Sequence, residues 1–199
     1  MPLQPLSPAE ELHSAVALSE QIKQIVNHCH GINLMGINAI LHTKRAGAGA
    51  SGFGVVSSEI RALSARLQRD LMHFGTQSQA LIDCASQLLK INRRQRLVAL
   101  GCTLCAQPDS ALHITLAQLD AQYQAIRARL DGLHAELYRQ AHDAHTHGRV
   151  GAVLARAATI ESAHAQGAHQ VLREVSARFE QQIERMLEGV ESLQRILAH

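Results

Sequence analysis

Apolar side chains recur along most of the chain in alternating steps of three and four, which places them on one face of a helix. In the first part of the chain this seam consists of Leu18, Ile22, Ile25, Cys29, Ile32, Gly36 and Ala39. The same spacing returns from Ile60 to Val98, from Leu112 to Leu137, and from Leu172 to Leu197. The pattern predicts long amphipathic helices that end near Arg45, Cys105 and His145, with a last helix that starts near Val150.

Glycine and proline mark the breaks between these helices. Gly47, Gly49 and Gly52 crowd together after the first seam, and glycine permits a sharp reversal of the backbone. Pro108 marks the second break, and the segment from His145 to Gly148 marks the third. The sequence therefore predicts two helical hairpins: residues 1–106, with a tip near 47–52, and residues 107–199, which turn near 148.

Each predicted hairpin carries an apolar stripe that has to be covered. The fold class is therefore all-α, and two hairpins packed together close an antiparallel four-helix bundle or coiled coil. Alternatively, each hairpin buries its stripe by forming a homodimer, and the sequence leaves this choice open. The first and third helices are expected to be nearly equal in length, with the second and fourth longer.

Composition removes several function classes. Hydrophobic residues make up 46% of the chain but aromatic residues only 3%, which disfavours β-sandwiches and barrels. The 19 basic and 17 acidic residues alternate along the chain, so no basic face points to nucleic acid. No apolar run approaches the ~20 residues of a membrane span. The four cysteines lack the density of a disulfide scaffold, and a cytoplasmic location is expected.

The segment from Asn33 to Ser64 resembles the hairpin tip of methyl-accepting chemotaxis proteins. It retains, without a gap, Asn33, the pair Asn38–Ala39, Arg45–Gly47, the Gly-Phe-x-Val-Val run from Gly52 to Val56, and the Glu-x-Arg of Glu59 and Arg61. A looser likeness runs from about residue 10 to 105, and residues 106–199 show none. The resemblance implies a chemoreceptor cytoplasmic signalling domain, whose tip contacts an adaptor, a histidine kinase and other receptors.

The resemblance also implies roles for individual residues. By position it assigns partner contacts to Asn38, His42, Arg45, Phe53, Val55, Val56, Glu59 and Arg61, and the hairpin turn to Gly47, Gly49 and Gly52. The chain departs from the family pattern at His30, His42, Ala48 and Ser51, where the family has contact-forming residues. Kinase coupling is therefore less firmly implied than the fold, and the alternative function is a metal- or small-ligand-binding bundle that has lost kinase control.

Comparison of the two hairpins suggests a further arrangement. The second hairpin is a candidate to occupy the place of the partner subunit in a receptor dimer. The chain would then be a single-chain mimic of that dimer, with both turns at one end. If the hairpins pack in this way, Cys29, Asp70 and His169 lie at similar distances from their turns and are expected to form a buried polar layer.

Three other motifs bear on chemistry. His142, His145 and His147 cluster near the expected second turn and are the candidate ligands for a transition metal, although solvated histidines are the more common case. The GxGxxG of Gly47 to Gly52 lacks the flanking strand of a dinucleotide site, and the CxxC of Cys102 and Cys105 has no second pair. No nucleophile with an adjacent base is apparent, so no enzymatic activity is expected.

Overall fold

The computed structural model describes residues 8–104, 110–165 and 168–198. Every long element in these ranges is an α-helix, and no strand occurs in them, which confirms the all-α prediction. The elements are α1 (Pro8–Ala46), the short 3-10 helix η1 (Ala48–Ala50), α2 (Ser51–Leu104), α3 (Ser110–His164) and α4 (His169–Leu197). None of these helices combines the length and apolar character that crossing a membrane requires.

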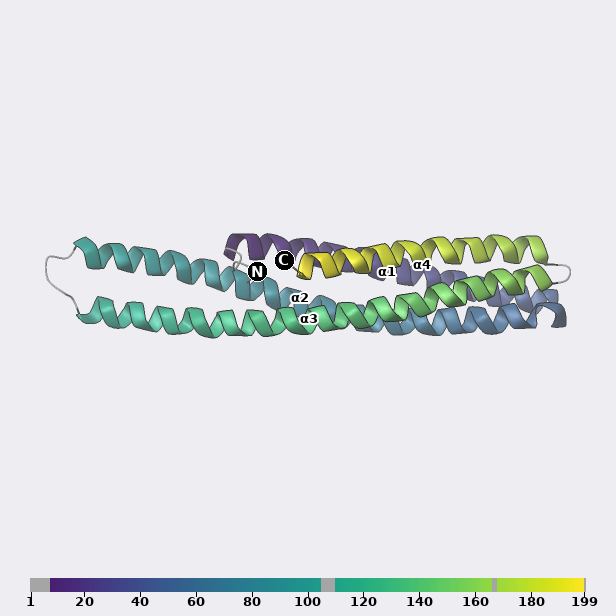
Figure 1. Ribbon diagram of the computed structural model, residues 1–199, viewed down its shortest axis with the longest axis horizontal. Coiled ribbons are helices and arrows are strands. Elements are labelled where there is room, and N and C mark those ends of the chain that lie inside the picture. Colours follow the sequence, from purple (N-terminus) through teal and green to yellow (C-terminus); the bar gives the residue numbers. More distant parts are fainter. Residues whose placement is uncertain (1–7, 105–109, 166–167, 199) are drawn as a thin grey trace.

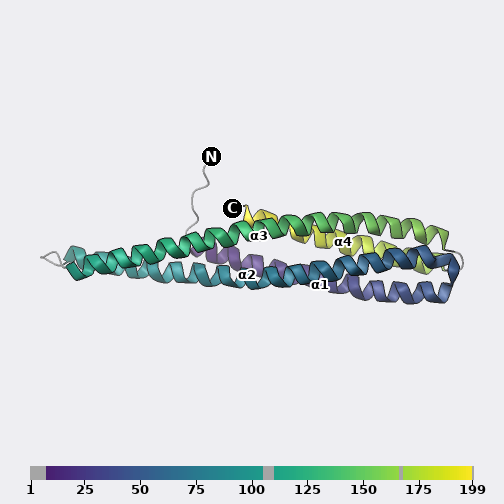
Figure 2. The same ribbon diagram turned by 90° about the horizontal axis from the view of Figure 1, so that it is seen from below.

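The helices form an elongated antiparallel bundle (Figures 1 and 2). α1 packs on α2, α2 on α3, α3 on α4, and α4 back on α1, so the four helices close a ring. The reversal between α1 and α2 and the reversal between α3 and α4 lie at the same end of the molecule, which we call the tip. At the other end α2 and α3 project beyond α1 and α4 as a two-helix stalk (Figure 1).

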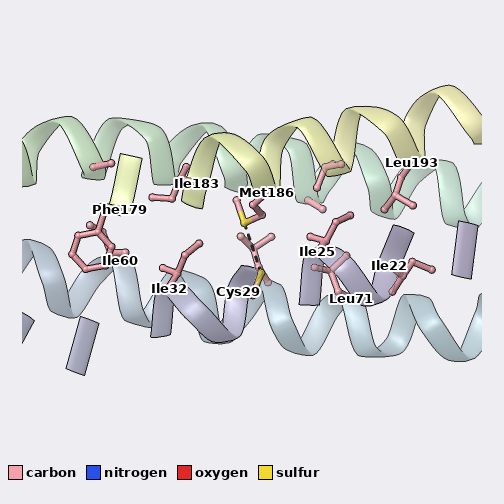
Figure 3. Close-up of a cluster of buried hydrophobic side chains, with 14 of the residues drawn as sticks. Ile22, Ile25, Cys29, Ile32, Ile60, Leu71, Phe179, Ile183, Met186 and Leu193 are labelled. Atoms are coloured by element: carbon pink, nitrogen blue, oxygen red, sulfur yellow. Dashed lines mark hydrogen bonds between the residues drawn. The ribbon is translucent and has the colours of Figure 1, made fainter. Parts of the chain in front are cut away.

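The core of the bundle is a continuous column of apolar side chains from all four helices. Phe53, Phe74 and Phe179 are among its largest fully buried members. Figure 3 shows a central section in which the Cys29 thiol approaches the Met186 sulfur at 3.7 Å. Burying a large apolar side chain contributes about 1.5–3 kcal/mol. This column therefore stabilises the bundle far more than intrinsic helix propensity does.

Near the start of α1 an ion pair joins α1 to α3. Glu11, only 1% exposed, accepts a hydrogen bond from Arg127, and Arg127 also lies 3.3 Å from Asp131. Beyond this level the α2 seam continues through Asn92 and Gln95, which are half-buried polar residues. In the stalk Gln95 lines a groove between α2 and α3, together with His113 and Leu116 of α3.

The second turn differs from the prediction. α3 runs without interruption through His145–Gly148 and ends at His164, and the chain reverses before His169. A Cβ on Gly148 would lie 2.6 Å from Leu187 Cδ2, so this glycine allows α4 to approach α3 closely and does not form a turn.

The second helix is longer than the first, as predicted, but the predicted lengths of the third and fourth helices were wrong for the same reason. α2 and α3 are the long helices, with 54 and 55 residues, whereas α1 and α4 have 39 and 29. The predicted boundaries near Arg45 and Cys105 agree with the observed ends of α1 and α2. Pro108 and Cys105 lie outside the described residues.

Candidate functional site: the bundle tip

Gly47 makes the reversal between α1 and α2. Its φ of 79° and ψ of −158° belong to a region that residues with a side chain rarely adopt. The Gly47 N–H donates to the Thr43 carbonyl at 3.1 Å, and the Ala50 N–H donates to the Gly47 carbonyl at 3.2 Å. Gly49 belongs to η1 and Gly52 to the first turn of α2. Of the three predicted turn glycines, only Gly47 has a backbone conformation that requires glycine.

The second hairpin packs directly against this turn. A side chain at Gly52 would collide with the Glu161 carboxylate of α3, so the two helices are close at this point. Ala50 of η1 and Ala165, just after α3, are both buried. The tip is thus built from both hairpins, as the single-chain arrangement requires.

The structure separates the predicted partner-contact residues by exposure. Asn38, Arg45, Val55, Glu59 and Arg61 are exposed, and His42 and Val56 are half-buried. Phe53 is 0% exposed, so its predicted contact with a partner is wrong and its ring is part of the bundle core.

Arg61 also has a structural role between α1 and α2. Its guanidinium Nε donates to the Asn33 side-chain oxygen at 3.2 Å. A Cβ on Gly36 would lie 3.1 Å from the Arg61 Cβ, so Gly36 gives this side chain room to cross α1. Asn33 and Arg61, both part of the receptor-like segment, therefore hold the two helices of the tip together.

Exposed apolar side chains near the tip were missed by the sequence analysis. Leu34, Ile37 and Leu41 of α1 are 49%, 38% and 50% exposed, and their spacing places them on one face of the helix. On α3, Val153 and Ile160 are 65% and 60% exposed. Contiguous exposed apolar surface commonly marks a protein interface. The sequence does contain a signal for this exposed surface, because these residues are apolar but fall outside the core seams.

The predicted buried layer of Cys29, Asp70 and His169 is wrong. Cys29 is buried, and this burial raises the pKa of its thiol to about 12. Asp70 and His169 are exposed. His169 is the first residue of α4 and lies beside the tip, because the second turn comes after His164 and not near Gly148.

The three candidate metal ligands do not converge. His145 Nε2 lies 3.6 Å from the Glu191 carboxylate of α4. His142 and His147 instead line a cavity of about 650 Å³ between α2 and α3, together with Asp70, His73 and Arg139. In the ranges that the structure describes, no three His, Cys, Asp or Glu side chains are placed to share a metal ion.

Comparison with known proteins gives a similarity to a probable chemoreceptor over part of the chain. No protein-family model matches the chain. A protein from Sinorhizobium fredii described as a probable chemoreceptor is 31% identical over 133 residues, which cover 58% of this chain. The match spans only 18% of that relative's length. This similarity supports a chemoreceptor-like relationship for part of the chain.

Proposed function

We propose that this protein is a chemoreceptor-like, cytoplasmic signal-transduction protein that acts by presenting its tip to an adaptor or a histidine kinase. The observation that carries the proposal is the tip itself. Asn38, Arg45, Val55, Glu59 and Arg61 of the receptor-like segment are solvent-exposed on a helical hairpin. The similarity to a probable chemoreceptor supports the same role.

The second hairpin supplies the two helices that a chemoreceptor obtains from a partner subunit. α3 and α4 lie antiparallel and complete the four-helix section with α1 and α2, and both reversals are at the tip. Glu161 packs over Gly52, which couples the two hairpins at the surface that partners would contact. One chain therefore provides a complete tip without a second copy.

A reconstituted mixture of a chemoreceptor, its adaptor and its histidine kinase tests the proposal. The full chain is expected to bind the adaptor–kinase complex and to change the rate of kinase autophosphorylation. Val55→Lys should weaken binding, because Val55 is 64% exposed and belongs to the tip. Met72→Lys is the matched control, since Met72 is 62% exposed on the same helix but farther from the turn.

Two results would contradict the proposal. One is the absence of both binding and any change in phosphorylation. The other is equal weakening by Val55→Lys and Met72→Lys, which would show that the tip is not the contact surface. The alternative function, a metal- or small-ligand-binding bundle that has lost kinase control, is favoured on its small-ligand side by the cavity between α2 and α3.

A further inference from the structure

The cavity between α2 and α3 lies along the bundle, away from the tip. Its volume of about 650 Å³ is within the range of small-molecule sites. Its polar lining consists of two carboxylates, three imidazoles, one guanidinium, one amide and one hydroxyl: Asp70, His73, Arg139, Gln140, His142, Asp143, Thr146 and His147. None of these groups is required for the contacts proposed at the tip.

The free charge on the wall of this cavity is negative. Arg139 donates to Glu136 Oε1 at 2.6 Å and to Asp143 Oδ2 at 3.1 Å, so its guanidinium is already neutralised by two carboxylates. Asp70 makes no hydrogen bond or ion pair with any residue in the described ranges. An anionic ligand would approach this free carboxylate and would compete with Glu136 and Asp143 for Arg139.

Two buried polar atoms in the lining of the cavity have no hydrogen-bond partner among the described residues. Gln140 donates its amide N–H to Glu136 Oε1 at 2.7 Å, which fixes the orientation of the amide and leaves its oxygen free. That oxygen and His147 Nδ1 are both buried and have no partner among the residues described. A buried acceptor without a donor is unfavourable, so a donor that enters from the cavity would relieve this cost.

We propose that this cavity binds a small aliphatic amine or diamine in its cationic form. An ammonium group offers three N–H donors and no acceptor, which complements the free Asp70 carboxylate and the unpartnered oxygen of Gln140. The alkyl chain would lie along Ala144, which belongs to the cavity wall and is buried. The proposal goes beyond the signalling role, since it places a ligand on the bundle independently of any protein partner.

Calorimetric titration of the full chain with 1,4-diaminobutane tests this site. At about pH 8 saturable binding is expected. Succinate, which has the same chain length and the opposite charge, should give no binding. Saturable binding of succinate, or no saturable binding of the diamine, would overturn the proposal and would leave the tip proposal unaffected.

A matched pair of variants locates the site. Asp70→Asn should weaken diamine binding by about tenfold, the factor that corresponds to the loss of about 1.4 kcal/mol. Asp83→Asn is the control, because Asp83 is an exposed aspartate of the same helix that accepts a hydrogen bond from Gln79. The control should bind as tightly as the unmodified chain. Equal weakening by the two variants, or none by Asp70→Asn, would show that the cavity is not the binding site.

Discussion

Gly189 of α4 faces Ile25 of α1 at a point where the two helices almost touch. A Cβ on Gly189 would lie 2.7 Å from Ile25 Cγ1 and 3.4 Å from Ile25 Cδ1. Ile25 is fully buried and branched at Cβ, so it has little freedom to move away. Gly189→Ala should therefore strain the packing that closes the ring of four helices.

Two opposing effects set the size of the change. Overpacking a well-packed core costs about 1–3 kcal/mol. Replacing glycine with alanine inside a helix returns about 1 kcal/mol. The net effect of Gly189→Ala on the free energy of unfolding is then a loss of about 0–2 kcal/mol.

Gly132→Ala is the matched control, since Gly132 is an exposed glycine inside α3 and a Cβ at this position would meet nothing within 4 Å. Gly132→Ala should raise the free energy of unfolding by about 1 kcal/mol, which is the full difference in helix propensity between glycine and alanine. Urea unfolding followed by circular dichroism measures both variants, and the difference between them isolates overpacking at about 1–3 kcal/mol. If Gly189→Ala were as stabilising as Gly132→Ala, then α4 would not pack on α1 as described.

Four other outcomes are expected. Phe53→Ala should lower the free energy of unfolding by about 3–5 kcal/mol, whereas Val55→Ala should change it little; equal effects in urea unfolding would mean that Phe53 is not in the core. Burial raises the pKa of Glu11 above its ordinary 4.5, so the native state prefers the protonated form and loses stability as pH rises from that ordinary value through the raised pKa. Glu11→Gln should remove this loss, and an unchanged pH profile in urea unfolding would contradict the burial. In the native protein at about pH 8 a maleimide should leave buried Cys29 unmodified and label half-buried Cys102, because the thiolate is the reactive form; peptide mass mapping distinguishes the two. Light scattering at micromolar concentration should give the mass of one chain, 21.7 kDa, and a dimer mass would refute the single-chain arrangement.

The first hairpin could be predicted from the sequence because local signals and packing agree there. The heptad seams run through most of α1 and α2, and the glycine cluster contains the one position in the described residues, Gly47, where φ is positive. Even so, the cluster did not show which glycine turns the chain. Gly52 lies inside α2 and faces Glu161, which is a contact with a distant segment.

The second hairpin was harder to predict because glycine serves two purposes. Gly148 and Gly151 weaken a helix locally, yet in α3 they make room for Leu187 and Ile183 of α4. From the sequence alone such glycines are interpreted as helix breaks, because the sequence does not show which helix packs against them. The prediction placed the second turn near residue 148, whereas α3 continues to His164. The expected position of each α4 residue along the bundle was therefore wrong, and His169 lies beside the tip instead of in the predicted buried layer.

The tip residues show the limit of a position-by-position resemblance. Phe53 lies one heptad before Ile60, which the sequence already placed on the buried seam, so its burial followed from periodicity alone. The exposed Leu34, Ile37 and Leu41 belong to the tip surface but have no counterpart in the predicted contacts. Periodicity identifies the buried seam, whereas the candidates for a partner surface are the exposed apolar residues that lie outside the seam.

The first turn of α1 and the last turn of α4 lie close together and midway along the molecule (Figure 1). A fluorescent protein or a surface tether joined there would sit at the side of the particle and leave both of its ends unobstructed. The same site of attachment could therefore serve for immobilising the protein, for energy-transfer labels and for tandem fusions without masking the surfaces whose binding is to be measured.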